Sequence, residues 1–177
     1  IWPLTTQQLR RSLALYASGV IDGIDGLAGG TFASIFAAYA GIAFFQNQMD
    51  IAALSAAISG GLLAFLWFNI PPARFYLSET GTMALTLALT VIAFLTDTLG
   101  GGRGVSVLPV IALLLVVTVL SNIMQMFGKK VLGRKILRIA PLHHHFEALG
   151  WPPYKVTMRY WVVGLVAAII GMTIALL

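Results

Sequence analysis

The chain has 177 residues, of which 59% are hydrophobic and only 10% are charged. Soluble domains carry about 25% charged residues, so this composition disfavours a soluble protein and indicates a membrane protein. The chain has no cysteine, which excludes disulfides, cysteine-based metal sites and cysteine nucleophiles. The formal net charge of +5 is interpreted as a signal for membrane orientation and anionic ligands, and not for binding of nucleic acid.

The chain begins at Ile1 and does not open with the charged region and cleavage site of a signal peptide. We therefore expect a fragment that starts within a longer protein. Residues 13–19 are apolar but too short to span a membrane. They are expected to form the end of an earlier span or a re-entrant segment.

Five segments have the length and composition of membrane spans, for which roughly 17–25 mostly apolar residues are needed. They are residues 29–45, 51–68, 82–96, 105–127 and 160–177. Buried helices of a soluble protein are disfavoured, because five such runs would leave almost no polar surface. The predicted fold class is all-α, a polytopic integral membrane protein with about five transmembrane helices in a single domain, residues 1–177.

The connecting segments predict the orientation of the spans. Alternation of sides places residues 19–28, 70–81 and 128–159 on one side and residues 46–50 and 97–104 on the other. The first side carries eight lysines and arginines, whereas the second carries only Arg103. Positive charge stays inside, so the first side is predicted to be cytoplasmic. Most of the polar residues lie on this rim, which favours a site for a cytosolic substrate over a channel or transporter with polar groups at the membrane midplane.

The segment DGIDGLAGG, residues 22–30, combines two acids with four glycines. Asp22 and Asp25 are three residues apart and would share one face of a helix. The glycines allow the backbone to approach a ligand closely. These carboxylates can hold a divalent ion or hydrogen-bond a sugar or base. The alternative is an ordinary turn or helix N-cap.

A second polar segment, FNIPPARFYLSETGT, occupies residues 68–82. Pro71 and Pro72 are expected to end the preceding helix. Glu79 comes just before the next apolar run, where it can cap the helix or bind Mg²⁺, which usually takes one or two carboxylates together with substrate phosphates. Tyr76 can stack on a base, or it can be an aromatic anchor at the membrane interface.

All three histidines of the chain stand together as His143, His144 and His145. Zinc is disfavoured, because three adjacent side chains cannot all face one ion from a helix and the chain has no HExxH or cysteine partner. Hydrogen bonds to phosphate oxygens are favoured instead, since the surrounding loop is rich in lysine and arginine. The alternative is a loop at the membrane surface whose basic residues meet anionic headgroups.

These motifs together resemble the C-terminal half of the bacterial phospho-N-acetylmuramoyl-pentapeptide transferases. That family belongs to the polyprenyl-phosphate N-acetylhexosamine-1-phosphate transferases, glycosyltransferase family 4. The resemblance runs from about Ser18 to the C-terminus. Its most specific part is APLHHHFEALGWPPYKVTMRYW, residues 140–161, which separates this branch from relatives that use UDP-N-acetylglucosamine.

The resemblance implies the last five helices of a ten-helix protein of the bacterial inner membrane, with a cytoplasmic active site and a possible homodimer. The implied reaction transfers phospho-N-acetylmuramoyl-pentapeptide from UDP to undecaprenyl phosphate. It yields lipid I and UMP, requires Mg²⁺ and is the first membrane step of peptidoglycan biosynthesis. The alternatives are transfer from UDP-N-acetylglucosamine or another UDP-amino sugar, and a membrane module or transporter without this activity.

The resemblance also implies roles for individual residues. Glu79 corresponds to the Mg²⁺ ligand, and Asp22 and Asp25 correspond to acids of the nucleoside and sugar site. Tyr76 takes the place of the aromatic residue on the uracil, and Asn69 that of a polar residue in the same pocket. The three catalytic histidines near the diphosphate correspond to His143, His144 and His145.

Three departures from the family pattern stand out. The family usually has aspartate where this chain has Glu79, and asparagine where it has Gly19. The adjacent Asp-Asp pair of the family's N-terminal half is absent from the chain. We therefore expect the chain to be inactive without that half.

Overall fold

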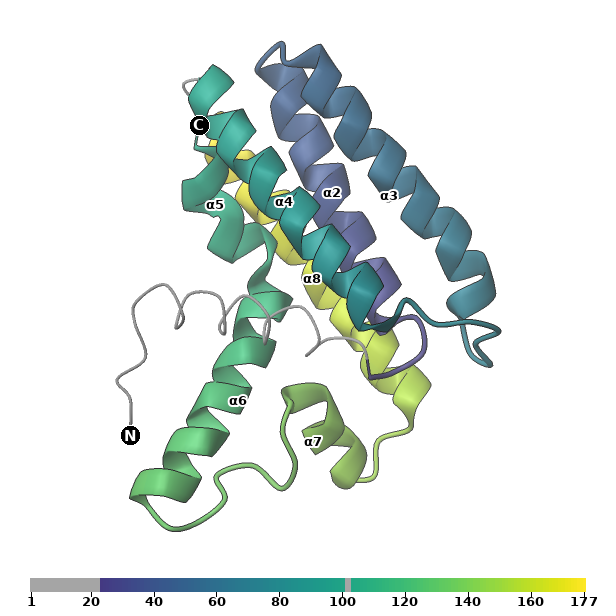
Figure 1. Cartoon of the computed structure of the whole chain (residues 1–177), viewed down its shortest axis with the longest axis vertical. Helices are drawn as coiled ribbons and strands as arrows, with labels where there is room; N and C mark the ends of the chain where they lie inside the picture. Colours follow the sequence, from purple (N-terminus) through teal and green to yellow (C-terminus); the bar gives the residue numbers. More distant parts are fainter. Residues whose placement is uncertain (1–22, 101–102) are drawn as a thin grey trace.

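The computed structural model describes residues 23–100 and 103–177, and every regular element within them is a helix. The helices are α2 (Leu27–Phe45), α3 (Met49–Asn69), α4 (Ser78–Gly100), α5 (Gly104–Ile111), α6 (Leu113–Val131), α7 (Leu142–Ala148) and α8 (Pro153–Leu176) (Figure 1). In this part of the chain, five helices are long and apolar enough to cross a membrane: α2, α3, α4 over Ser78–Asp97, α6 and α8. The predicted all-α polytopic membrane fold is therefore confirmed.

Helix α2 is the core of the bundle and packs mainly against α3 and α8. The side chains of Phe32, Phe36 and Tyr39 are fully buried, and the helix has no distinct polar face. A helix that is apolar all round is expected to be buried on all sides. The Tyr39 hydroxyl donates a hydrogen bond to the Gly104 carbonyl oxygen at 2.7 Å and so joins α2 to α5.

The outer helices present apolar side chains on the surface of the bundle. Leu63, Leu87, Leu120 and Leu165 are each more than half exposed, on α3, α4, α6 and α8 respectively. Such surfaces suit helices that contact lipid or further membrane helices, since lipid chains are as apolar as leucine.

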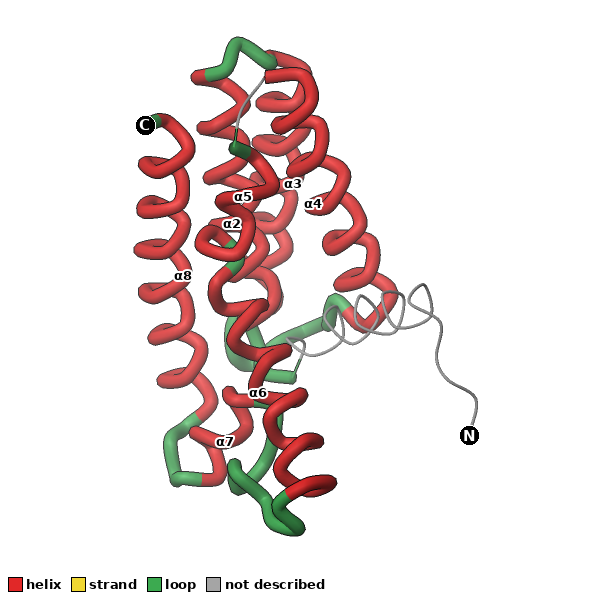
Figure 2. Tube along the Cα trace, turned by 90° about the vertical axis from the view of Figure 1, so that its left-hand side faces the viewer, coloured by secondary structure: helices red, strands yellow, loops and turns green. Residues whose placement is uncertain are grey.

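The segment predicted as a single span at residues 105–127 is two helices in the structure. Helix α5 ends at Ile111, the backbone turns at Ala112, and α6 begins at Leu113. Pro109 lies inside α5, where it has no N–H to donate to the helix ladder. Helix α6 therefore leaves the bundle in a new direction and passes beside α7 (Figures 1 and 2).

Three connecting segments meet at the end of the bundle that carries α7: the turn before α2, the loop from α3 to α4, and the segment from α6 to α8 (Figures 1 and 2). We call this the α7 end. Asp25, Asn69, Glu79 and the three histidines all belong to these segments or to helix ends next to them. The fold thus gathers the candidate residues that the structure describes at one end of the helices.

Candidate active site at the α7 end

The acid-glycine turn, residues 23–26, is fixed by a side chain from the end of α3. The Asn69 side-chain oxygen accepts the Gly26 N–H at 2.9 Å, and its amide nitrogen donates to the Phe75 carbonyl oxygen at 2.8 Å. Gly26 has a φ of 76°, a left-handed conformation that glycine adopts at little cost. Asn69 is 5% exposed, so it connects the turn to the α3–α4 loop. A contribution of Asn69 to nucleotide binding would therefore consist of positioning the turn and the loop relative to each other.

Asp25 and helix α8 hold the same turn from other directions. The Asp25 carboxylate accepts the Ala73 N–H at 3.1 Å, and the Asp25 carbonyl oxygen accepts the Thr157 hydroxyl at 3.1 Å. The Trp161 indole N–H donates to the Gly26 carbonyl oxygen at 3.0 Å. Asp25 therefore has a structural partner in the α3–α4 loop. Asp22, the other predicted acid, and Gly19 lie outside the described residues.

The histidine segment lies directly against this turn, although more than 100 residues separate them in the sequence. A methyl group added at Gly23 would lie 2.7 Å from His144 Nε2 and 3.0 Å from His143 Nε2. Real side-chain carbons do not come within 3.0 Å of another non-bonded atom, so any residue larger than glycine at this position would force the His144 imidazole to shift. The acid-glycine turn and the histidines thus form one site.

The three histidines have different surroundings. The His143 side chain is fully buried, and its ring lies 4.4 Å from the His144 ring and meets the Tyr160 ring edge-on at 6.4 Å. Burial, followed by the neighbouring His144, lowers the pKa of His143 to about 3. This imidazole is therefore neutral at physiological pH. No hydrogen-bond partner for either of its ring nitrogens occurs within the described ranges.

His144 and His145 point to different partners. His144 Nδ1 lies 2.5 Å from a Glu147 carboxylate oxygen. His145 Nδ1 accepts the Arg138 N–H at 3.2 Å, and the Arg138 side chain donates to the Ala148 carbonyl oxygen at 3.2 Å. His145 therefore helps to close the loop that precedes α7.

Helix α6 anchors the loop that carries the histidines. The side-chain oxygen of Gln125, a buried residue, accepts the N–H groups of Ile136 at 3.1 Å and Leu137 at 2.8 Å, and its nitrogen donates to the Leu137 carbonyl oxygen at 2.9 Å. The Ser121 hydroxyl accepts the Leu142 N–H at 3.0 Å. The change of direction at Ala112 brings these α6 side chains to the loop.

An aromatic stack fixes the other end of α7. The Phe146 and Trp151 rings lie 4.9 Å apart and nearly parallel, at 19°. The Arg159 guanidinium carbon lies 4.1 Å from the centre of the Trp151 ring, and the Lys155 ammonium lies 5.4 Å from it. Contacts of this kind are attractive because the face of the indole is negative. They hold two cations of α8 next to the histidine segment.

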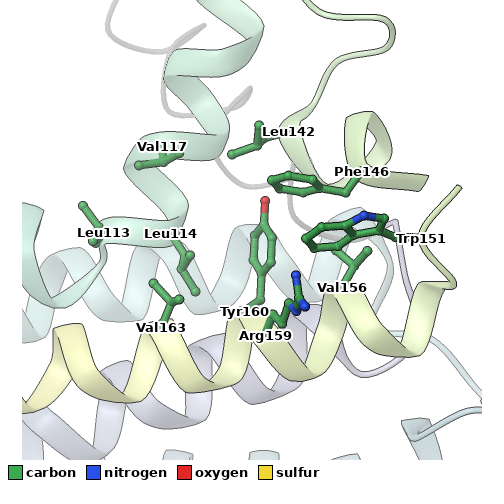
Figure 3. Close-up of a pocket in the computed structure, with 10 residues that line it drawn as sticks. All are labelled: Leu113, Leu114, Val117, Leu142, Phe146, Trp151, Val156, Arg159, Tyr160 and Val163. Carbon is green, nitrogen blue, oxygen red and sulfur yellow. The ribbon is translucent and has the colours of Figure 1, made fainter. Parts of the chain in front are cut away.

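A mostly apolar cavity of about 320 Å³ lies between α6, α7 and the start of α8 (Figure 3). Its walls include Leu114, Val117, Phe146 and Val163. Arg159 is the charged residue of the lining, and Tyr160 points from α8 toward Leu142 and Phe146 (Figure 3). The cavity can accommodate an apolar chain with an anionic group near Arg159.

Glu79 and Tyr76 lie on the exposed side of the α3–α4 loop. Glu79 is exposed in the first turn of α4, and Tyr76 is 66% exposed. The neighbouring Phe75 ring lies 5.3 Å from the Phe65 ring and 5.6 Å from the Phe68 ring and so does not cover Tyr76. The Tyr76 ring is thus free to stack on a planar group.

No group of three acidic, histidine or cysteine side chains in residues 23–100 and 103–177 is placed to hold a metal ion. Glu79 nevertheless offers one exposed carboxylate. Mg²⁺ usually takes only one or two carboxylates and completes its coordination with water and substrate phosphates. The donors present therefore fit an ion whose remaining ligands come from a substrate, and they do not form a complete protein cage.

Several residues that shape the site were not predicted from the sequence: Gln125, Glu147, Thr157 and Trp161. A sequence signal existed for Glu147, which follows His144 by three residues, a spacing that brings side chains together on a helix. The other three act through backbone groups of distant segments, and such contacts leave no local sequence pattern.

Comparison with known proteins gives the class of the chain. A family model described as glycosyl transferase family 4 matches residues 13–97. This chain is also similar to phospho-N-acetylmuramoyl-pentapeptide-transferases from Anoxybacillus flavithermus, Bacillus subtilis and Geobacillus kaustophilus. The identities are 40%, 39% and 39%, each over 158 residues. These matches cover 89% of this chain and 47% of each relative, so the chain spans about half the length of the curated relatives it matches.

The fold is that of a polytopic membrane protein, and residues 13–97 are similar to glycosyl transferase family 4. Over most of its length the chain is also similar to phospho-N-acetylmuramoyl-pentapeptide-transferases. The resemblance predicted from the histidine and acid-glycine motifs is therefore confirmed.

Proposed function

We propose that the chain is the C-terminal half of a bacterial inner-membrane transferase. The enzyme would move phospho-N-acetylmuramoyl-pentapeptide from its UDP carrier to undecaprenyl phosphate and release UMP. One observation carries the proposal: Gly23 of the acid-glycine turn lies so close to His143 and His144 that a methyl group added there would come within 3.0 Å of both imidazoles. This contact unites the two motifs that resemble the family in a single site, in a chain whose relatives are named for this activity.

The charge at the α7 end supports binding of a polyanionic donor. The segments that meet there, and the ends of α6 and α8 next to them, carry the basic residues Arg74, Lys129, Lys130, Arg134, Lys135, Arg138, Lys155 and Arg159. Charge-assisted hydrogen bonds from such side chains and from imidazoles are strong toward phosphate oxygens. The exposed Tyr76 ring would stack on the uracil, and Asp22 and Asp25 would contact the nucleoside and sugar. This end of the bundle would face the cytoplasm, where the nucleotide is made.

The lipid acceptor would enter from the membrane. The apolar cavity between α6 and α8 would take part of its chain, and Arg159 would attract its phosphate. A phosphate oxygen of the lipid would bond to the β-phosphorus of the UDP-sugar as the bond to the bridging oxygen of UMP breaks. Such reactions depend chiefly on positioning and on neutralisation of charge.

Glu79 would hold the Mg²⁺ ion of the proposed enzyme. The ion, when bound, would neutralise the diphosphate and stabilise the departing UMP. The extra methylene of glutamate relative to the aspartate usual in the family would be accommodated by the exposed position of Glu79 at the start of α4. The N-terminal half that the relatives possess would supply further acids.

UMP release by the full-length protein in detergent, with undecaprenyl phosphate and Mg²⁺, tests the proposal. We expect release from UDP-N-acetylmuramoyl-pentapeptide that stops when Mg²⁺ is chelated. Glu79→Gln should abolish release, whereas Asp50→Asn, an exposed acid at the opposite end of the bundle, should leave it unchanged. Activity of the Glu79→Gln protein within a few-fold of wild type would contradict the metal role of Glu79. Absence of release from the wild type would indicate a non-catalytic membrane module.

A further inference from the structure

Glu147 is an acid of the α7 end for which neither the motifs nor the proposed reaction supplies a role. It lies on α7 three residues after His144, and its carboxylate oxygen is 2.5 Å from His144 Nδ1. An ionised carboxylate only accepts hydrogen bonds, so an ionised Glu147 requires the proton of this contact to lie on Nδ1 of the imidazole. The bond therefore determines which ring nitrogen of His144 remains for other partners.

That remaining nitrogen faces the acid-glycine turn. His144 Nε2 is the atom nearest to a methyl group placed at Gly23, at 2.7 Å. The centre of the His144 ring lies 4.4 Å from the centre of the His143 ring. Glu147, His143 and Gly23 thus hold the imidazole from three directions, and the side chain is still 34% exposed.

The neighbouring histidines cannot take the place of His144. His143 is fully buried, and His145 uses Nδ1 to accept the Arg138 N–H. Among the three, His144 combines a partly exposed ring with a nitrogen aimed at the turn.

We propose that Glu147 is a positioning residue, which orients the His144 imidazolium so that its Nε2–H faces an oxygen of a diphosphate bound at the acid-glycine turn. The inference rests on the proposed function for the identity of that ligand. Without an acceptor at Nδ1, the ring can rotate about its Cβ–Cγ bond, and Nε2 loses its fixed direction. Misplacement of a catalytic group by about 1 Å can cost on the order of 100-fold in rate.

Steady-state UMP release by the full-length protein is the first test. Glu147→Ala is expected to lower kcat about tenfold or more with little change in KM for the UDP-sugar. Glu147→Gln is expected to retain most of kcat, because its amide oxygen still accepts the Nδ1 proton. The matched control Asp50→Ala removes an exposed acid far from α7 and should behave as wild type. A wild-type kcat for Glu147→Ala would overturn the proposal.

Ring ¹⁵N NMR of histidine-labelled full-length protein tests the same contact without any reaction. The His144 signals, identified by their loss in His144→Gln, should show a protonated Nδ1. The Nδ1 signal should shift in Glu147→Ala and stay near its position in Glu147→Gln. An unprotonated Nδ1 in the wild type, or no shift in Glu147→Ala, would overturn the proposal.

The two readouts separate failure of this inference from failure of the proposed function. If the wild type releases no UMP, the proposed function fails and the NMR result alone decides whether Glu147 orients His144. If the wild type is active, the unfolding temperature of Glu147→Ala must also be measured. A lowered unfolding temperature with unchanged kcat per folded molecule would reduce Glu147 to a structural residue and overturn the proposal.

Discussion

The side-chain oxygen of Asn69 accepts the backbone N–H of Gly26 at 2.9 Å, and the two residues lie 43 positions apart in the chain. This bond joins the end of α3 to the turn that begins α2, and it continues through the Asn69 amide nitrogen to Phe75. The acid-glycine turn and the loop with Tyr76 and Glu79 are therefore positioned by one buried side chain.

Replacement of Asn69 by alanine should destabilise the protein. The Gly26 N–H and the Phe75 carbonyl oxygen would both lose their partner, and a buried polar group left without one costs about 1–3 kcal/mol. Thermal unfolding in detergent measures the effect. Thr90→Ala is the control, because the Thr90 hydroxyl bonds only within its own exposed helix face. Equal unfolding temperatures for the two variants would contradict the role of Asn69.

Gly30→Ala should disrupt the contact between α2 and α8. The added methyl would lie 2.1 Å from Trp161 Nε1, and Trp161 cannot move away without losing its bond to the Gly26 carbonyl oxygen. Overpacking of this kind costs about 1–3 kcal/mol.

Gly60→Ala provides a matched control for that change. Gly60 lies within α3, and a methyl group there would meet nothing within 4 Å. Alanine in a helix interior is favoured over glycine by about 1 kcal/mol, so the unfolding temperature should stay level or rise. If Gly60→Ala lowered the unfolding temperature more than Gly30→Ala, the described packing of α2 on α8 would be wrong.

Gly23→Ala should impair the proposed reaction more than the stability. Gly23 is exposed, and the atoms that its methyl would meet are the outer nitrogens of His144 and His143. His144 has room to turn away, but Nε2 would then no longer face the turn. We expect UMP release to fall about tenfold or more while the unfolding temperature changes little. Unchanged release would indicate that this contact is not part of the site.

The buried His143 predicts a pH dependence of stability. Burial lowers its pKa in the folded protein to about 3, whereas an unfolded histidine has a pKa of about 6.5. Between these values the unfolded state binds one more proton than the folded state. Stability is therefore full above about pH 6.5 and falls as the pH decreases, by up to about 1.4 kcal/mol per pH unit.

His143→Asn removes this group and should flatten the dependence. Wild type and variant are each unfolded in denaturant at pH 7.5 and at pH 5. For each protein, the free energies of unfolding at the two pH values are then compared. The other histidines are present in both proteins, so their contribution cancels. The same loss of stability on acidification in both proteins would mean that His143 does not titrate in the way its burial requires.

The sequence predicted the helices better than their breaks and contacts. Five apolar runs of spanning length were enough to indicate five membrane helices, because length and hydropathy are local properties. The division of the fourth run at Ala112 was not predicted, since a proline such as Pro109 can also sit in a continuous kinked helix.

For the candidate site, the motifs indicate segments that the structure brings together, but they do not indicate the contacts of each side chain. The sequence pattern does not distinguish the three histidines, whereas the structure shows a buried His143, a His144 paired with Glu147 and a His145 that closes a loop. These differences arise from packing against α6, α8 and the acid-glycine turn. The pairing of His144 with Glu147 has a helical spacing that a sequence can show, whereas the burial of His143 depends on segments distant in the chain, which leave no such pattern.

The most direct test of the central claim is a comparison of two donors. The full-length protein in detergent, with undecaprenyl phosphate and Mg²⁺, would be given UDP-N-acetylmuramoyl-pentapeptide or UDP-N-acetylglucosamine, and UMP would be measured. We predict release from the first donor only, with the histidine segment responsible for the choice. Release of UMP from the second donor only would support the proposed phosphoryl transfer but contradict the proposed substrate. Release from neither donor would contradict the proposed function.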